Sequence, residues 1–131
     1  MPFFFDRNLR LLIIAPWNYL PAMDPILLGH LPGFERISVS TDCDDGLRLA
    51  LMIDPDVILL PWRASMRKLL SALIHLRGKR STPLIAVVAD AASPQDDLPD
   101  PKVLMIKAEQ LNDEEFTSHI LRSAIIVADE I

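Results

Sequence analysis

The sequence predicts an α/β protein built on a doubly wound sheet of five parallel strands, with helices on both faces in a three-layer α/β/α arrangement. Short apolar runs alternate with helix patterns along the chain, which favours parallel strands joined by right-handed crossovers. Several of these runs are apolar at every position, as strands covered on both faces are. With 131 residues, 50% of them hydrophobic, the chain can form one domain with a substantial core. We expect an N-terminal extension over residues 1–8 and one domain over residues 9–131.

The first two strands are expected on either side of a short helix. Residues 9–15 form a branched, apolar run that is stopped by a proline, which is typical of a buried strand. Asp24 and Pro25 provide a cap and a first-turn proline for a helix that stops at Pro32-Gly33. Residues 36–40 alternate in polarity and are β-branched, so they indicate an edge strand.

The middle of the chain predicts a helix, a central strand and a second helix. Thr41 or Asp42 can cap the first of these helices, which must end before Pro55, since the residue before a proline is driven out of the helical region. Residues 56–60 are apolar after their first position, as a central parallel strand should be. The second helix is expected from Ser65 and ends at a glycine followed by two basic residues.

The last part of the chain predicts two further strands and a final helix. Residues 83–89 are again unbroken and apolar, whereas residues 90–102 are rich in proline and aspartate. We expect a loop there, so that the fourth helix is short or missing. Residues 103–106 form the fifth strand, and Asn112 with Glu115 makes a capping box for a last helix with a wide apolar arc.

Charge and cysteine content exclude several classes of function. The net charge is −5 and the 13 basic residues are dispersed, apart from a cluster at Arg77, Lys79 and Arg80, so no broad cationic face for direct nucleic-acid binding is expected. Cys43 is the only cysteine and cannot form an internal disulfide, and the three histidines lack metal-ligand spacing with it. The apolar runs are too short for a signal peptide or a membrane span. We therefore expect a cytoplasmic protein without a metal or a cofactor.

Three segments together carry a resemblance to a known family. They are Pro-Asp-Val-Ile-Leu-Leu before the third strand-to-helix turn, Pro-Leu-Ile-Ala-Val-Val-Ala as the fourth strand, and the lysine that closes the fifth strand. In this order and spacing the chain resembles the receiver domain of bacterial response regulators, from Leu9 to about Ala128. The resemblance implies a flavodoxin-like fold.

The resemblance also implies that the chemistry of a receiver is missing. Receivers accept a phosphoryl group on an aspartate at the end of the third strand, beside Mg²⁺ held by an acidic pair after the first strand. They also use a hydroxyl residue at the end of the fourth strand and a lysine at the end of the fifth. The residues at those positions are Ala15 and Pro16 for the acidic pair, Pro61 for the phosphoacceptor, Val88 for the hydroxyl residue and Lys107 for the lysine. Only the lysine is retained, so the chain is similar to a degenerate pseudo-receiver with no catalytic residue.

Four other residues are candidates for binding at the carboxyl ends of the strands. Trp17 and Trp62 both follow strands, so they either fill the degenerate pocket or, with Arg63 alongside, form a contact for a protein partner. Asp90 lies near the end of the fourth strand. We expect Asp90 to form a salt bridge with Lys107 or Arg63, because one carboxylate without Mg²⁺ ligands is a poor phosphoacceptor.

These observations favour a non-catalytic signalling or regulatory domain that works through protein contacts. In receivers, the face made by the fourth helix, fifth strand and fifth helix is a common dimer surface. With the fourth helix short or missing, Leu104, Leu121 and Ile125 are expected to bury against a partner protein or a second copy. Under this hypothesis the domain acts either as a homodimer or as the input domain of a longer regulator, with an output domain beyond Ile131.

A second hypothesis belongs to another class of function. The cleft at the carboxyl ends of the strands could sense a small molecule or a nucleotide, because aromatic and cationic side chains gather there. Its residues would be Trp17, Trp62, Arg63 and Lys107.

Overall fold

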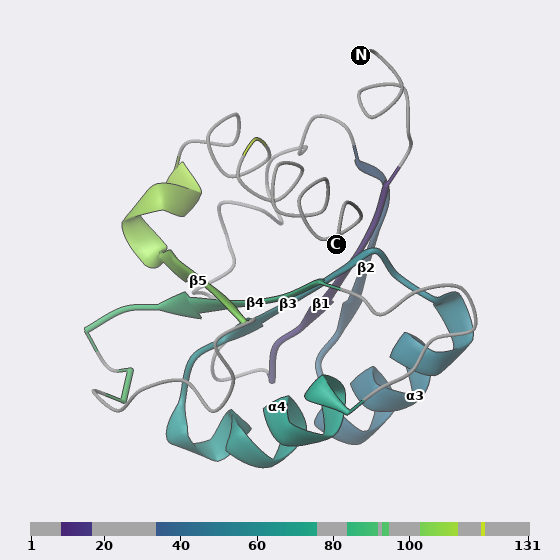
Figure 1. Ribbon diagram of the computed structural model, residues 1–131, viewed down its shortest axis with the longest axis horizontal. Coiled ribbons are helices and arrows are strands. Elements are labelled where there is room, and N and C mark those ends of the chain that lie inside the picture. Colours follow the sequence, from purple (N-terminus) through teal and green to yellow (C-terminus); the bar gives the residue numbers. More distant parts are fainter. Residues whose placement is uncertain are drawn as a thin grey trace.

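The computed structural model describes residues 9–16, 34–75, 84–91, 93–94, 103–112 and 119. Five strands and four helical segments lie in this part of the chain (Figure 1). The strands are β1 (Leu9–Ile14), β2 (Phe34–Ser40), β3 (Val57–Pro61), β4 (Leu84–Ala89) and β5 (Leu104–Lys107). The helical segments are α3 (Cys43–Ile53), η2 (Ala64–Met66), α4 (Arg67–Ile74) and η3 (Ala108–Asn112), of which η2 and η3 are 3₁₀-helices.

The strands form one parallel sheet in the order β2-β1-β3-β4-β5. This is the strand order of the flavodoxin-like doubly wound fold. It confirms the predicted fold class, the central position of β3 and the edge position of β2. Helices α3 and α4 lie side by side on the same face of the sheet, below it in Figure 1.

Both faces of the sheet are buried, as the continuous apolar runs predict. One set of side chains packs with α3 and α4: Leu12, Ile14, Ala50, Ile58, Leu60, Trp62, Met66, Leu69, Leu70, Leu73, Ile85, Val87 and Val103. The other set faces away from these helices: Leu9, Leu11, Ile13, Ala15, Val57, Leu59, Ala86, Val88 and Ile106. The alternation of strand side chains between two faces therefore divides the core into two layers.

The amino ends of β1 and β3 are joined by a polar network. Asp56 Oδ2 accepts a hydrogen bond from the backbone N–H of Arg10 at 2.9 Å, and Asp56 N–H donates to the carbonyl oxygen of Arg10 at 3.0 Å. The guanidinium of Arg10 donates to the carbonyl oxygen of Ile53 at 3.1 Å, so it also holds the end of α3. Asp54 ends that helix in the left-handed conformation, with φ of 49°.

Helix α3 begins at one of the two predicted caps. The side chain of Asp42 accepts a hydrogen bond from the backbone N–H of Asp44 at 2.9 Å, and Asp44 and Asp45 lie in the first turn. Carboxylates at this end stabilise the helix because its first N–H groups point toward them. Gly46 is buried where this helix approaches β1.

Strand boundaries differ from the prediction by one or two residues. Strand β2 begins at Phe34 rather than at residue 36, and β3 includes Pro61 rather than ending before it. The predicted helix from Ser65 is divided into η2 and α4.

Several predictions fall outside the part of the chain that the structure describes. They are the extension over residues 1–8, the helix near Asp24, the stop after residue 76 and the last helix beyond residue 112, apart from residue 119. Of the predicted loop over residues 90–102, residues 90, 91, 93 and 94 are described, and none of them is helical.

Candidate functional site

The carboxyl end of β3 is a buried proline that joins the ladder to β4. Pro61 pairs with Val88, and both are buried, as is Ala15 at the end of β1. Proline cannot donate to a ladder, but here the hydrogen bond on the β4 side comes from the next residue, whose N–H lies 2.8 Å from the carbonyl oxygen of Val88. The last β1–β3 pair is Ile13 with Leu59, so the proline lies beyond it. The proline is therefore compatible with a central strand.

These positions hold no carboxylate that could take a phosphoryl group or bind Mg²⁺. Ala15 and Val88 are 0% and 1% exposed, respectively, and Pro16 is half-buried. Both Mg²⁺ coordination and phosphoryl transfer need accessible oxygen ligands. Ala15 and Val88 instead pack in the core, and the two prolines lie where β1 and β3 end.

An ion pair joins the segments that follow β3 and β4. Arg63 Nη2 lies 2.7 Å from Asp90 Oδ2, and the two side chains are 15% and 29% exposed. The sequence left Arg63 and Lys107 as alternative partners of Asp90, and the structure has the Arg63 pair. Partial burial and a short distance make this pair stronger than a fully solvated one.

Ser93 extends the ion pair into a wider network. Ser93 Oγ donates to the carbonyl oxygen of Trp62 at 2.7 Å and accepts from the backbone N–H of Asp90 at 2.9 Å. Arg63 Nη1 donates to the same carbonyl oxygen at 3.0 Å. We call Arg63, Asp90 and Ser93 the strand-end clamp. It fixes the backbone after β3 to the backbone after β4.

Trp62 lies in the core beneath the start of α4. Its side chain is 0% exposed, and the guanidinium of Arg67 lies 5.2 Å from the centre of its ring. Burial of this kind favours the hypothesis that Trp62 fills the degenerate pocket over the hypothesis that it forms a surface contact. Its indole Nε1 is buried and has no hydrogen-bond partner in the part of the chain that the structure describes. Trp17, the other candidate, lies outside the described residues.

Lys107 ends β5 with an exposed side chain. Its backbone N–H donates to Gln110 Oε1 at 2.9 Å, which is one half of a capping box at the start of η3. The capping box predicted at Asn112 and Glu115 concerns a later helix, and Glu115 lies outside the described residues. The bond to Gln110 is a separate feature that the sequence analysis missed. The sequence signal for this bond is a glutamine three residues after Lys107, the spacing of a capping box, because η3 begins directly after β5.

Cys43 lies at the start of α3, half-buried, with its Sγ 3.9 Å from the Sδ of Met66. Burial raises the pKa of the Cys43 thiol, and the negative charges of Asp42 and Asp44 raise it further. A raised pKa leaves less thiolate at neutral pH and makes the sulfur a weaker nucleophile.

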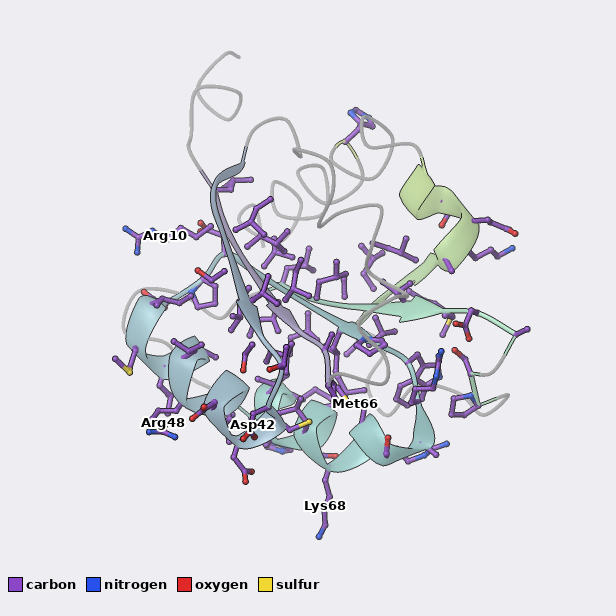
Figure 2. All side chains as sticks on the ribbon, turned by 180° about the vertical axis from the view of Figure 1, so that it is seen from behind. Arg10, Asp42, Arg48, Met66 and Lys68 are labelled. Carbon is purple, nitrogen blue, oxygen red and sulfur yellow. The ribbon has the colours of Figure 1, made fainter. Side chains whose placement is uncertain are left out.

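Figure 2 shows Met66 between α4 and the sheet, whereas Lys68 points away from the helix.

Acidic and histidine side chains do not gather into a metal site in the part of the chain that the structure describes. Asp42 is a helix cap, and Asp45 forms an exposed ion pair with Arg48 on the outer side of α3. His75 Nδ1 lies 2.8 Å from the carbonyl oxygen of Ser71, and His119 is exposed.

The comparisons with known proteins add no family. No family model matches the chain, and no curated protein matches it. Within the described residues, no helix has both the length and the apolar character needed to cross a bilayer.

Proposed function

We propose that this chain is a non-catalytic regulatory domain, similar to a phosphorylation-independent receiver, that acts through contacts with a partner protein or a second copy. One observation carries the proposal: the carboxyl end of the central strand is a buried proline beside the strand-end clamp. A phosphoacceptor at this place would need an exposed carboxylate and neighbouring Mg²⁺ ligands. A regulatory role that does not use phosphate fits this arrangement better than a phosphorylated switch.

The first experiment tests independence from phosphate. Wild-type protein is titrated with acetyl phosphate, and separately with beryllium fluoride, in the presence of Mg²⁺, while tryptophan fluorescence and amide NMR shifts are recorded. We expect no change, because Ala15, Pro16 and Pro61 provide no carboxylate. A saturable change that requires Mg²⁺ would contradict the proposal. Pro61→Asp is the comparison variant and should also stay silent, because the Mg²⁺ ligands after β1 are still missing.

The surface proposed for contacts lies along β5. This strand is an edge of the sheet, so one side of its backbone has no strand neighbour among the described residues. Met105 is 43% exposed on it, and Leu104 is half-buried. Leu121 and Ile125, the other residues expected on this face, lie outside the described part of the chain. A stable dimer would have to bury about 1,000 Å² or more here, with an apolar centre.

A second experiment tests the homodimer. Sedimentation equilibrium is measured over a concentration range that reaches high micromolar, for wild type and for two variants. Met105→Asp should weaken association, because it places a charge in the apolar centre of the proposed surface. Met52→Asp is the matched control, since Met52 is 71% exposed on α3, on a different element. A monomeric wild type, or equal effects of both variants, would contradict a dimer through β5.

Cytoplasmic location is part of the same proposal, since a single thiol such as Cys43 stays reduced there.

The hypothesis that the strand-end cleft senses a small molecule predicts a change in melting temperature when that molecule binds. An increase in melting temperature with a nucleotide or another anionic small molecule would favour it over a contact domain.

A further inference from the structure

The indole N–H of Trp62 is an exception in this core. It is buried, it has no hydrogen-bond partner among the described residues, and the ring around it is fully shielded from solvent. Buried polar groups are nearly always paired, because an unpaired donor loses its hydrogen bonds to water. Any conformation that lets water reach this nitrogen therefore recovers a hydrogen bond. The closed position of Trp62 must be maintained by other contacts.

Besides the packing of its ring, polar contacts converge on the backbone of Trp62. Its carbonyl oxygen accepts from Ser93 Oγ at 2.7 Å and from Arg63 Nη1 at 3.0 Å. Arg63 is held in turn by Asp90, and the N–H of Ser93 donates to the carbonyl oxygen of Asp90 at 3.1 Å. The clamp therefore connects the residue with the unpaired indole to the segment after β4.

A separate hydrogen bond ties Trp62 to the sheet. Its backbone N–H donates to the carbonyl oxygen of Val88 at 2.8 Å. This bond belongs to the β3–β4 ladder, which continues through buried pairs such as Leu60 with Val87. The clamp contacts are partly exposed polar interactions, whereas the ladder lies in the core. Segments held by partly exposed polar contacts open at lower free energy than core ladders.

We propose that the strand-end clamp is a latch that keeps the Trp62 indole out of water, and that the latch opens while the β3–β4 ladder stays formed. In the closed state Arg63 bridges Asp90 and the Trp62 carbonyl oxygen. In the open state Asp90 and Ser93 leave Arg63, and the indole N–H gains a hydrogen bond to water. This inference concerns the conformations of the chain and does not depend on its function as a contact domain.

Hydrogen exchange distinguishes the two parts of Trp62 directly. The indole N–H has no hydrogen bond, so its protection reports burial alone, whereas the backbone N–H reports the ladder. Both rates are measured by NMR on the same ¹⁵N-labelled sample, and Trp17→Phe assigns the indole signal. In the wild type we expect the indole N–H to exchange faster than the backbone N–H, after correction for the intrinsic rate of each group.

Asp90→Asn is the main variant, because it keeps the shape of the side chain and removes the charge that holds Arg63. Loss of a charge-assisted hydrogen bond should raise the open population, and with it the indole exchange rate, by about tenfold. The backbone rate of Trp62 should stay unchanged. Ser93→Ala removes the bridging hydroxyl and should act in the same direction with a smaller effect. Asp45→Asn disrupts the exposed ion pair with Arg48 on α3 and should change neither rate.

Two results would overturn the inference. An indole rate that Asp90→Asn and Ser93→Ala both leave unchanged would mean that the clamp does not protect Trp62. An equal acceleration of indole and backbone N–H would mean that Trp62 is exposed only when the ladder opens, so that the clamp contributes to global stability alone. If Asp90→Asn does not fold, Ser93→Ala and the wild-type comparison of the two rates decide between the same outcomes.

Discussion

Replacing Gly46 by alanine tests how closely α3 lies against β1. A Cβ at Gly46 would lie 2.7 Å from Cγ2, 2.8 Å from Cδ1 and 2.9 Å from Cγ1 of Ile14. Favourable carbon–carbon contacts lie at about 3.5 to 4.0 Å, so all three distances are too short. Ile14 is fully buried, and its β-branched side chain is restricted at χ1. The helix or the isoleucine must therefore move to admit the methyl group.

Two opposing terms set the size of the effect. Alanine in place of glycine within a helix contributes about 1 kcal/mol of stability. Overpacking of a core by a methyl group costs about 1 to 3 kcal/mol. Because three carbons of one buried side chain are involved, we expect the overpacking term to dominate. Gly46→Ala should lower the free energy of unfolding by about 1 kcal/mol in urea denaturation followed by circular dichroism.

A double-mutant cycle isolates the contact. Ile14→Ala alone should cost about 2 to 5 kcal/mol, because it leaves a cavity in the core. In that background the space beside Gly46 is open, so Gly46→Ala should become stabilising by about 1 kcal/mol. The two substitutions would then be coupled by about 2 kcal/mol. If Gly46→Ala stabilises the wild-type background as much as the Ile14→Ala background, the close approach inferred here is wrong.

Four further predictions concern the start of α3 and the indole. Asp42→Ala should cost about 1 kcal/mol in urea denaturation, because it removes the helix cap on the Asp44 N–H. Cys43 should react slowly with iodoacetamide at pH 8, and Asp44→Asn should accelerate it, because a negative charge that raises the thiol pKa is lost. The stability that Cys43 contributes as a neutral thiol is fully present below its unfolded-state pKa and is lost as pH rises through its folded-state pKa. The free energy of unfolding should therefore fall more between pH 7 and alkaline pH in wild type than in Cys43→Ala. Trp62→Phe should cost much less than the roughly 3 to 5 kcal/mol expected for Trp62→Ala, because phenylalanine keeps an aromatic ring in this fully buried site; equal melting temperatures of the two variants would contradict this expectation.

The sheet could be predicted from the sequence because its strands are apolar at nearly every position, a pattern with few alternatives in a chain of this length. Whether Pro61 belongs to the strand was more difficult to predict. A proline normally indicates the end of a strand, but whether it can belong to the ladder depends on which side its missing N–H would face. Here the Trp62 N–H makes the bond to β4, a geometric fact that only the register of β3 against β4 reveals.

The contacts at the strand ends could be predicted only in part. An ion pair for Asp90 followed from the sequence, but the choice of Arg63 depends on the turn in which Ser93 binds both Asp90 and the Trp62 carbonyl oxygen. The burial of Trp62 depends on where α4 starts against the face of the sheet, which no local pattern specifies. Met105 is exposed although it lies in an apolar run, because β5 is an edge strand of the sheet.

The clamp and the β5 edge suggest two independent ways in which this domain could be regulated. A clamp that fixes β3 to β4 opposes rearrangement at the strand ends, so the association proposed at Met105 needs no change there. If association through β5 is regulated by the latch, Asp90→Asn should change both the indole exchange rate and the sedimentation behaviour. If the two are separate, Met105→Asp should alter association alone, and Asp90→Asn should alter exchange alone. We expect the second result, because Asp90 pairs with Arg63 on the β3 side rather than with Lys107 on β5, and the Lys107 N–H is held by Gln110.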